Sequence, residues 1–160
     1  MSFLELLQSS PLTFTSLCGI LGMMVGSFLN VVIHRLPKML ELGWQQQCAE
    51  LRGEEPEPKA VYNLILPHSA CPHCNHRISA WENIPVFSYL LLRGKCKGCG
   101  TAISPRYPII ELSSGIMCAY AAWHFGFGMA TVGALLLIWA LLALTAIDFD
   151  TQLLPDDITL

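Results

Sequence analysis

Charged residues are scarce in this sequence, and basic residues are absent from both of its ends. Only 13% of the residues are charged, whereas 53% are hydrophobic. A soluble domain carries about 25% charged residues, so much of the surface is expected to face lipid rather than water. The net charge of −3 is small and argues against a nucleic-acid partner.

Three apolar segments are long enough to cross a bilayer, which takes about 20 mostly apolar residues. They cover residues 12–33, 108–127 and 129–147, and Glu111 in the second is the one charged residue among them. The first segment lacks the features of a signal peptide. No basic residue precedes it, and no small-residue cleavage site leads into a mature soluble domain.

The basic residues all lie between the first and the second apolar segment. Because Lys and Arg near membrane spans stay in the cytoplasm, residues 34–107 are expected inside the cell and the N-terminus outside. The connection around Gly126 and Gly128 then forms an external turn. The basic residues are Arg35, Lys38, Arg52, Lys59, Arg77, Arg93, Lys95, Lys97 and Arg106.

The expected fold is a mainly α, polytopic membrane protein with three transmembrane helices. A small cytoplasmic four-cysteine zinc-knuckle module is inserted between the first and the second helix. The predicted divisions are an external tail and first helix (1–36), the cytoplasmic module (37–107), and the second and third helices with the C-terminal residues (108–160). Residues 39–60 are polar and are expected to form a linker or a short solvated helix.

Two features of the first segment bear on its packing and its end. Gly22 and Gly26 form a GxxxG step, which lets two helices approach closely, although glycine is also common in membrane helices for no such reason. Pro37 removes a backbone donor and is expected to stop the helix at the interface.

The cysteine pairs of the module predict a metal site. Cys71 and Cys74 form one CxxC, Cys96 and Cys99 form another, and residues 75–95 separate them. Two such turns supply four thiolates for a tetrahedral site, and a module this small gains folding energy from a metal. The closed ligand set indicates structural zinc.

More than one state remains open for these cysteines. Iron fits the same ligands. Two disulfides or four free thiols are also compatible with the spacing, although a reducing cytosol disfavours disulfides. The neighbouring histidines exceed the ligand count and are expected at the surface. The remaining cysteines in the apolar segments are expected to act as small apolar residues, and Cys48 has no evident partner. These residues are His68, His73, His76, Cys18 and Cys118.

Acidic residues near the membrane are candidate functional groups. Glu111 either serves a function or snorkels to the interface and pairs with Arg106. Asp148 lies where the third apolar segment ends, and partial desolvation there suits a carboxyl that must share a proton. Asp156 and Asp157 are better explained as caps of a following helix after Pro155.

Four segments together resemble the type IV prepilin leader peptidase/N-methyltransferase family. The resemblance lies in the first-span sequence GSFLNVVIHRLP (26–37), the two cysteine pairs with ISAWENIP (78–85) between them, ISPRYPIIE (103–111) and the aspartate motif that begins at Asp148. It implies a bacterial inner-membrane enzyme of type IV pilus and type II secretion systems.

The resemblance implies two activities. An aspartic endopeptidase removes the basic leader of prepilins and pseudopilins, with Asp148 as the first catalytic aspartate. An N-methyltransferase then uses S-adenosylmethionine on the new N-terminal residue. The sequence contains no glycine-rich loop of Rossmann type, and it assigns no residue to this cofactor.

The family's second catalytic aspartate belongs to a GxGD motif, which this sequence does not contain. We therefore expect a fragment whose 160 residues alone do not cleave prepilin. Two other classes of function compete with this interpretation. One is a non-enzymatic membrane protein whose zinc knuckle docks a cytoplasmic partner. The other is a metal-dependent hydrolase, which would need an open metal position that four thiolates do not leave.

Overall fold

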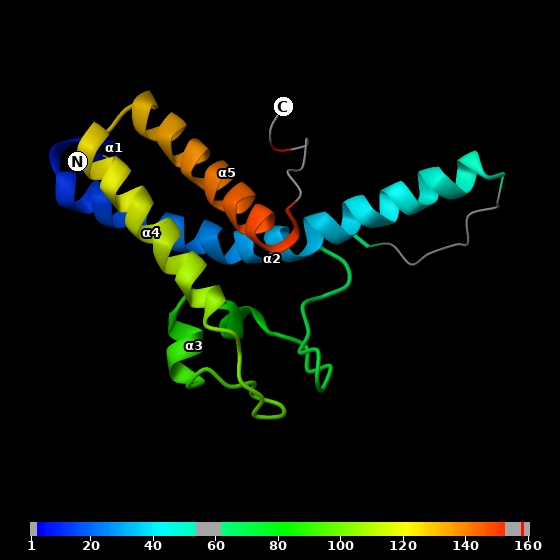
Figure 1. The fold of residues 1–160 in the computed structure, drawn as a ribbon. Helices are drawn as coiled ribbons and strands as arrows, with labels where there is room; N and C mark the ends of the chain where they lie inside the picture. The colour runs from blue at the N-terminus through cyan, green and yellow to red at the C-terminus, as the bar shows by residue number, and fades with distance from the viewer. Residues whose placement is uncertain (1–2, 54–61, 153–157, 159–160) are drawn as a thin grey trace.

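The computed structural model describes residues 3–53, 62–152 and 158, and these residues are mainly helical. The helices are α1 (Phe3–Ser9), α2 (Pro11–Leu51), the 3-10 helix η1 (Ala80–Asn83), α3 (Phe87–Leu91), α4 (Arg106–Phe125) and α5 (Met129–Thr151). The long helices α2, α4 and α5 pack as a bundle in Figure 1, with the segment between α2 and α4 placed beside one end of it.

Local sequence signals account for where the long helices begin and turn. The Ser10 side chain caps α2 by accepting a hydrogen bond from the Thr13 amide at 3.4 Å, and Pro11 follows at the first helical position. Gly126 adopts a φ of 68° between α4 and α5, a conformation that glycine reaches without steric cost. The chain therefore turns around Gly126 and Gly128, as predicted, and the external position of this turn stays a prediction.

Helices α2 and α4 approach so closely that side chains would collide at the crossing. A Cβ atom added to Gly22 would lie 2.7 Å from the Cβ of Cys118, and one added to Gly26 would lie 2.9 Å from the Cα of Glu111. The Ser114 hydroxyl donates a hydrogen bond to the Gly22 carbonyl at 2.6 Å. The GxxxG step is thus a real helix-packing site.

Helix α5 packs on this pair and completes two apolar clusters. Trp139 contacts both of them, so the third helix is joined to the α2–α4 crossing along its length. The first cluster contains Leu29, Ile33, Ile110, Ala143 and Ile147. The second contains Cys18, Cys118, Ala122 and Leu135.

The prediction that Pro37 ends the first helix is wrong. Helix α2 continues through Pro37 to Leu51, and Figure 1 shows its second half turning away from the axis of its first half. Proline removes one helical hydrogen bond and bends a helix. The following residues are mostly Leu, Glu, Gln and Ala, which favour helix, so the helix continues on the far side.

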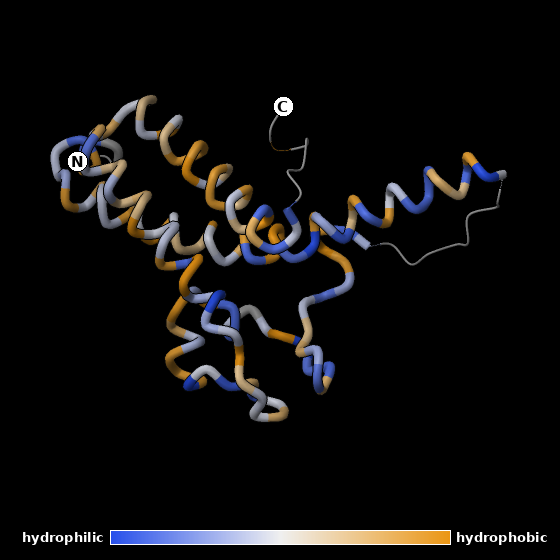
Figure 2. Tube along the Cα trace, viewed as in Figure 1, coloured by the Kyte–Doolittle hydropathy of each residue, from blue (hydrophilic) through white to orange (hydrophobic). Residues whose placement is uncertain are grey.

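Figure 2 shows many hydrophobic residues along the helices of the bundle, and large apolar side chains such as Ile116, Leu136 and Leu137 are exposed on them. Among the described helices, α2 and α5 are long and apolar enough to cross a membrane, and α4, with its buried Glu111 and Ser114, does not meet the same measure of hydropathy. Helix α5 also extends past the predicted end at residue 147 to Thr151. Asp156, Asp157 and residues 54–60 of the predicted linker lie outside the described residues.

Candidate functional site

The two cysteine pairs form two hairpins of the same geometry. In the first, the Cys71 amide donates to the His76 carbonyl at 2.9 Å, and Ala70 pairs with Arg77 in an antiparallel bridge. In the second, the Cys96 amide donates to the Thr101 carbonyl at 2.8 Å, and a second antiparallel bridge flanks it. Each hairpin therefore presents its two thiols from a tight backbone turn.

The turns close through left-handed residues at equivalent positions. Asn75 has a φ of 56° and Gly100 a φ of 72°. Asparagine and glycine are the residues that adopt this conformation most readily. Gly100 adopts this conformation without steric cost, and Gly98 leaves space for the first hairpin, because a Cβ there would lie 3.0 Å from the Cβ of His76.

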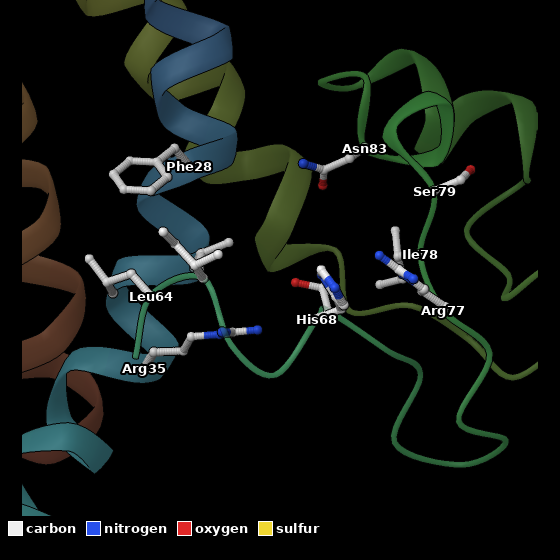
Figure 3. Close-up of a pocket in the computed structure, with 11 residues that line it drawn as sticks. Phe28, Arg35, Leu64, His68, Arg77, Ile78, Ser79 and Asn83 are labelled. Carbon is white, nitrogen blue, oxygen red and sulfur yellow. The ribbon is translucent and has the colours of Figure 1, made fainter. Parts of the chain in front are cut away.

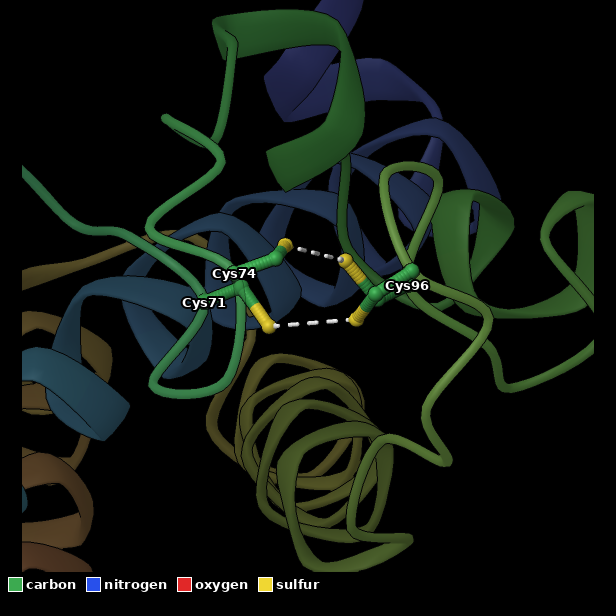
Figure 4. Close-up of side chains that lie close together, drawn as sticks. Cys71, Cys74 and Cys96 are labelled. Atoms are coloured by element: carbon green, nitrogen blue, oxygen red, sulfur yellow. Dashed lines mark hydrogen bonds between the residues drawn. The ribbon is translucent and has the colours of Figure 1, made fainter.

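The four cysteine sulfur atoms converge on one point. They all lie within 4.8 Å of one another. The Sγ atoms of Cys71 and Cys99 are 3.8 Å apart, and those of Cys74 and Cys96 are 3.9 Å apart; the dashed lines in Figure 4 mark these two pairs. Zinc–sulfur bonds of about 2.3 Å in a tetrahedron separate sulfur atoms by about 3.8 Å. A disulfide would need about 2.05 Å, so the geometry fits a four-thiolate metal site.

Hydrogen bonds at the cluster favour the thiolate form of Cys99, whereas burial and the neighbouring cysteine side chains raise the pKa of Cys74 to about 12. The side chain and then the amide of Thr101 hydrogen-bond to the sulfur of Cys99 and lower its pKa to about 6. A thiol with this pKa is largely deprotonated at neutral pH, and the thiolate is the form that binds a metal. The predicted ligand set therefore fits a metal site in its distances, and Cys99 also fits it in its protonation state.

Glu82 joins the two hairpins from outside the cluster. It accepts a hydrogen bond from the Ser79 amide at 2.9 Å. It also lies 3.4 Å from the His76 ring of the first hairpin and 3.6 Å from the Lys97 ammonium of the second. The Ser79 amide is the main reason that the pKa of Glu82 falls to about 2. The carboxylate is thus a polar clamp between the hairpins.

The histidines near the cluster and the cysteines outside it lie largely where they were predicted. His68 and His73 are exposed, His76 is half-buried against Glu82, and no histidine joins the described metal cluster. Cys18 and Cys118 are buried in the bundle, whereas Cys48 is exposed on α2.

Three buried polar residues of α2 attach the cysteine module to the bundle. The Ser27 hydroxyl donates to the Asn83 carbonyl at 3.5 Å, and the Asn30 amide donates to the Tyr107 carbonyl at 3.2 Å. The Arg35 guanidinium donates to the carbonyls of residues 63 and 67 at 2.9 and 2.5 Å. Each satisfies a backbone carbonyl in a different part of the module.

Glu111 in turn satisfies a backbone amide of the module. It is 8% exposed, and its Oε2 accepts a hydrogen bond from the Val86 amide at 2.8 Å. Val86 has a φ of 60°, a strained conformation for a β-branched residue. The alternative that Glu111 pairs with Arg106 does not hold, because Arg106 faces another carboxylate.

That carboxylate is Asp150 at the end of α5. The Arg106 Nη1 lies 2.6 and 2.5 Å from the two carboxylate oxygens, and Nη2 donates to the Ala146 carbonyl at 3.2 Å. These contacts bring the end of α5 to the start of α4, where the module rejoins the bundle. Asp148 lies in this last turn of α5, and its side chain is exposed. The aspartate and the cysteine cluster thus belong to the same end of the bundle.

A cavity of about 240 Å³ separates α2 from the first part of the module. Figure 3 shows Phe28 and Arg35 on the helix side of the cavity and His68 and Arg77 on the module side. None of its described lining residues is acidic. A cationic sulfonium ligand would find no counter-charge there, so this cavity is not assigned to S-adenosylmethionine.

Sequence reasoning predicted the cluster of four thiols and proposed Asp148 as a candidate, but it missed the residues that connect the module to the bundle. Ser27, Asn30 and Arg35 carried a signal only as polar residues in or next to an apolar helix. The pair of Arg106 and Asp150 had no local signal, because α4 and α5 separate the two residues in sequence.

Comparisons with known proteins give the family. The family model described as "Bacterial Peptidase A24 N-terminal domain" matches residues 20–125. Relatives named "Prepilin leader peptidase/N-methyltransferase" include those of Pseudomonas aeruginosa (55% identical, covering 100% of this chain and 56% of the relative) and Aeromonas hydrophila (51%, 98% and 55%). The Legionella pneumophila relative is 48% identical over 89% of this chain and 50% of its own length. The chain thus spans about half the length of these relatives. No solved structure matches.

Proposed function

Because this chain belongs to the Bacterial Peptidase A24 N-terminal domain family, we propose that it serves in a bifunctional membrane enzyme of the bacterial inner membrane. The enzyme cleaves the basic leader of type IV prepilins and of pseudopilins, and it N-methylates the new N-terminal residue. The names of the relatives support both activities. The non-enzymatic docking protein is not favoured, because these relatives carry an enzyme's name.

The proposed topology has three membrane spans. Helices α2 and α5 are long and apolar enough to be spans. Helix α4 packs against both of them and is proposed as the third span. The distribution of basic residues supports a cytoplasmic position for the module (37–107), between the first division (1–36) and the last (108–160). A basic leader would then meet the enzyme on the side where it is made.

The proposed cofactor of the module is structural zinc. Cys71, Cys74, Cys96 and Cys99 would hold it, and four thiolates leave no open position for a reacting water. The metal would replace the hydrophobic core that the module lacks. Methyl transfer would use S-adenosylmethionine, whose contacts are not assigned to any residue of this chain.

Asp148 is the proposed catalytic residue of this chain. Its exposed carboxylate lies at the bundle end that carries the module, beside the ion pair of Arg106 and Asp150, and this placement is the observation that carries the proposal. One carboxylate of an aspartic peptidase activates water while a second, protonated one polarises the scissile carbonyl. The second carboxylate is proposed to come from a GxGD motif outside residues 1–160.

The test is an Asp148→Asn substitution in the full-length gene product. Cleavage of a prepilin in detergent should fall about 10²–10⁴-fold, the usual contribution of a general acid–base group, while zinc content stays unchanged. Glu41→Gln, on the exposed far part of α2, is the matched control and should retain wild-type cleavage. Wild-type cleavage by Asp148→Asn, or cleavage by purified residues 1–160, would refute the assignment.

A further inference from the structure

The segment between the two cysteine hairpins contains an apolar surface that the metal site does not use. Residues 81–92 carry one charged side chain, Glu82, which faces the hairpins. Phe87, Leu90 and Leu91 on α3 are 64%, 66% and 83% exposed, and Trp81 is 82% exposed. Large side chains that gather on a surface in this way mark an interaction site.

Helix geometry places three of these side chains together. Phe87, Leu90 and Leu91 follow the i, i+3, i+4 spacing that puts residues on one face of a helix. Tyr89 lies on the other face, where its hydroxyl donates to the Ile103 carbonyl at 3.4 Å and its ring covers Gly94. The tyrosine face therefore packs on the module, and the apolar face points away from it. Figure 2 shows this hydrophobic stretch beside the start of α4.

Two hydrogen bonds fix the depth of this segment along the bundle. Ser27, which binds Asn83, lies six residues before Ile33, or about 9 Å inside the predicted end of the first span. Glu111, which binds Val86, lies five residues after Arg106, or about 7 Å into α4. Contacts from two different helices thus place residues 83–86 on the membrane side of Arg35 and Arg106, the residues that mark the interface.

The same two bonds remove a specific obstacle to contact with lipid. Irregular backbone at membrane depth is tolerated only when its polar groups find partners within the protein. The Asn83 carbonyl and the Val86 amide lie in the irregular stretch between η1 and α3, and they are bound by Ser27 and Glu111. The buried carboxylate and hydroxyl therefore do what water would do elsewhere.

We propose that residues 81–92 are a membrane-docking segment that inserts into the head-group region of the leaflet at the module's end of the bundle. The acyl chains receive the α3 face, and the Trp81 ring lies at the interface, where tryptophan is enriched. Arg93 and Lys95, which are exposed directly after α3, meet anionic head groups. The inference rests on the proposed membrane placement of α2, α4 and α5.

The four native tryptophans provide a test in the full-length gene product, reconstituted in vesicles of phosphatidylcholine and phosphatidylglycerol. Three variants each retain one of Trp81, Trp123 and Trp44, and the other tryptophans are replaced by Phe. Lipids brominated near the glycerol end of their acyl chains should quench Trp81 and Trp123 at least twice as strongly as Trp44. Aqueous iodide should give the reverse order.

The outcomes separate the inference from its premise. If iodide quenches Trp81 as it quenches Trp44, and brominated lipid does not, the segment faces water and the inference fails. If neither reagent quenches Trp81, another protein segment covers it, and the inference fails as well. If brominated lipid also fails to quench Trp123, the membrane placement of the bundle is wrong, and the inference fails with it.

A photocrosslinker supplies an independent measurement that leaves all tryptophans in place. Benzoylphenylalanine at position 91 should form adducts with phospholipid, as it should at Leu137 on the exposed face of α5. At Gln46, on the far part of α2, it should form none. Adducts at position 91 with protein instead of lipid would overturn the proposal.

Discussion

The bundle and the cysteine module are two folded parts of one chain that are stabilised in different ways. In the bundle, Gly22, Gly26 and Gly115 let backbones touch, and apolar clusters fill the rest. In the module, Cys71 and Gly94 are the buried residues among those of 62–105 whose burial is described. The bundle therefore depends on shape, whereas the module depends on the chemistry of four thiols and a few polar contacts.

The largest expected effect comes from removing one thiol. Cys74→Ser should abolish stoichiometric zinc binding and unfold the hairpins, because structural zinc contributes on the order of 10–16 kcal/mol to small zinc-binding peptides. Amide exchange of residues 69–104 should lose protection, while Cys118 in the bundle stays unreactive to maleimide. Metal content and exchange mass spectrometry measure both regions at once.

The control for this experiment is Cys48→Ser, since Cys48 is exposed on α2 and outside the cluster. It should retain zinc and protection. If Cys74→Ser also exposes Cys118, the two regions fold as one unit and the comparison fails.

The second prediction tests whether shape stabilises the bundle. Gly22→Val should cost about 3 kcal/mol, the upper range for overpacking, because its Cβ would meet the Cys118 Cβ at 2.7 Å and the Ser114 carbonyl at 2.8 Å. Thermal unfolding in detergent, monitored by the maleimide labelling of Cys18, measures this loss of stability. Zinc content should not change.

Gly43 provides the matched position on the same helix, since nothing lies within 4 Å of a Cβ there. Gly43→Val should be neutral or slightly stabilising, because valine has a higher helix propensity than glycine. Equal losses at the two positions would show that the close approach of α2 and α4 at Gly22 is not the cause of the effect.

The third prediction concerns the contact between the two regions. Glu111→Leu leaves the Val86 amide without its partner, which should cost on the order of 1–2 kcal/mol. The effect should appear as faster amide exchange at residues 84–91, with zinc still bound. Glu111→Gln retains an acceptor oxygen and should lose less. If both variants exchange alike, the hydrogen bond does not hold the module.

The smallest expected effect is at Glu82. The Ser79 amide lowers the pKa of this carboxyl to about 2, below its ordinary value. Its contribution is therefore complete above the ordinary glutamate pKa and is lost as the pH falls towards about 2. At pH 7, Glu82→Gln should speed exchange of the Ser79 amide a few-fold and leave zinc bound, with Glu41→Gln as control. Loss of zinc would mean that the clamp is essential to the site.

Local patterns in the sequence predicted much of this architecture. The apolar runs at 108–127 and 129–147 correspond to α4 and α5, and the CxxC pairs predicted the thiol cluster, because each CxxC spacing presents two thiols from one turn. The prediction at Pro37 failed because a single proline removes one hydrogen bond and does not outweigh a run of helix-favouring residues. Whether Asp148 is catalytic stays a prediction.

The residues that the sequence did not reveal act over long distances along the chain. Ser27 binds a carbonyl in the module, and Arg106 reaches a carboxylate at the end of α5. Such contacts depend on how helices cross, which residue periodicity does not specify. They are also the contacts that place Asp148 and the thiols at one end of the bundle.

The length of α2 has a consequence of its own. A helix of 41 residues extends about 60 Å, roughly twice the thickness of a bilayer's hydrocarbon core. Its far part leaves the bundle at an angle beyond Pro37, as Figure 1 shows, so under the proposed topology residues 38–51 project from the bundle as a helical arm. A partner bound near Leu51 would then be connected to the chain leading into the hairpins through this helix and the bonds of Arg35 to the carbonyls of residues 63 and 67.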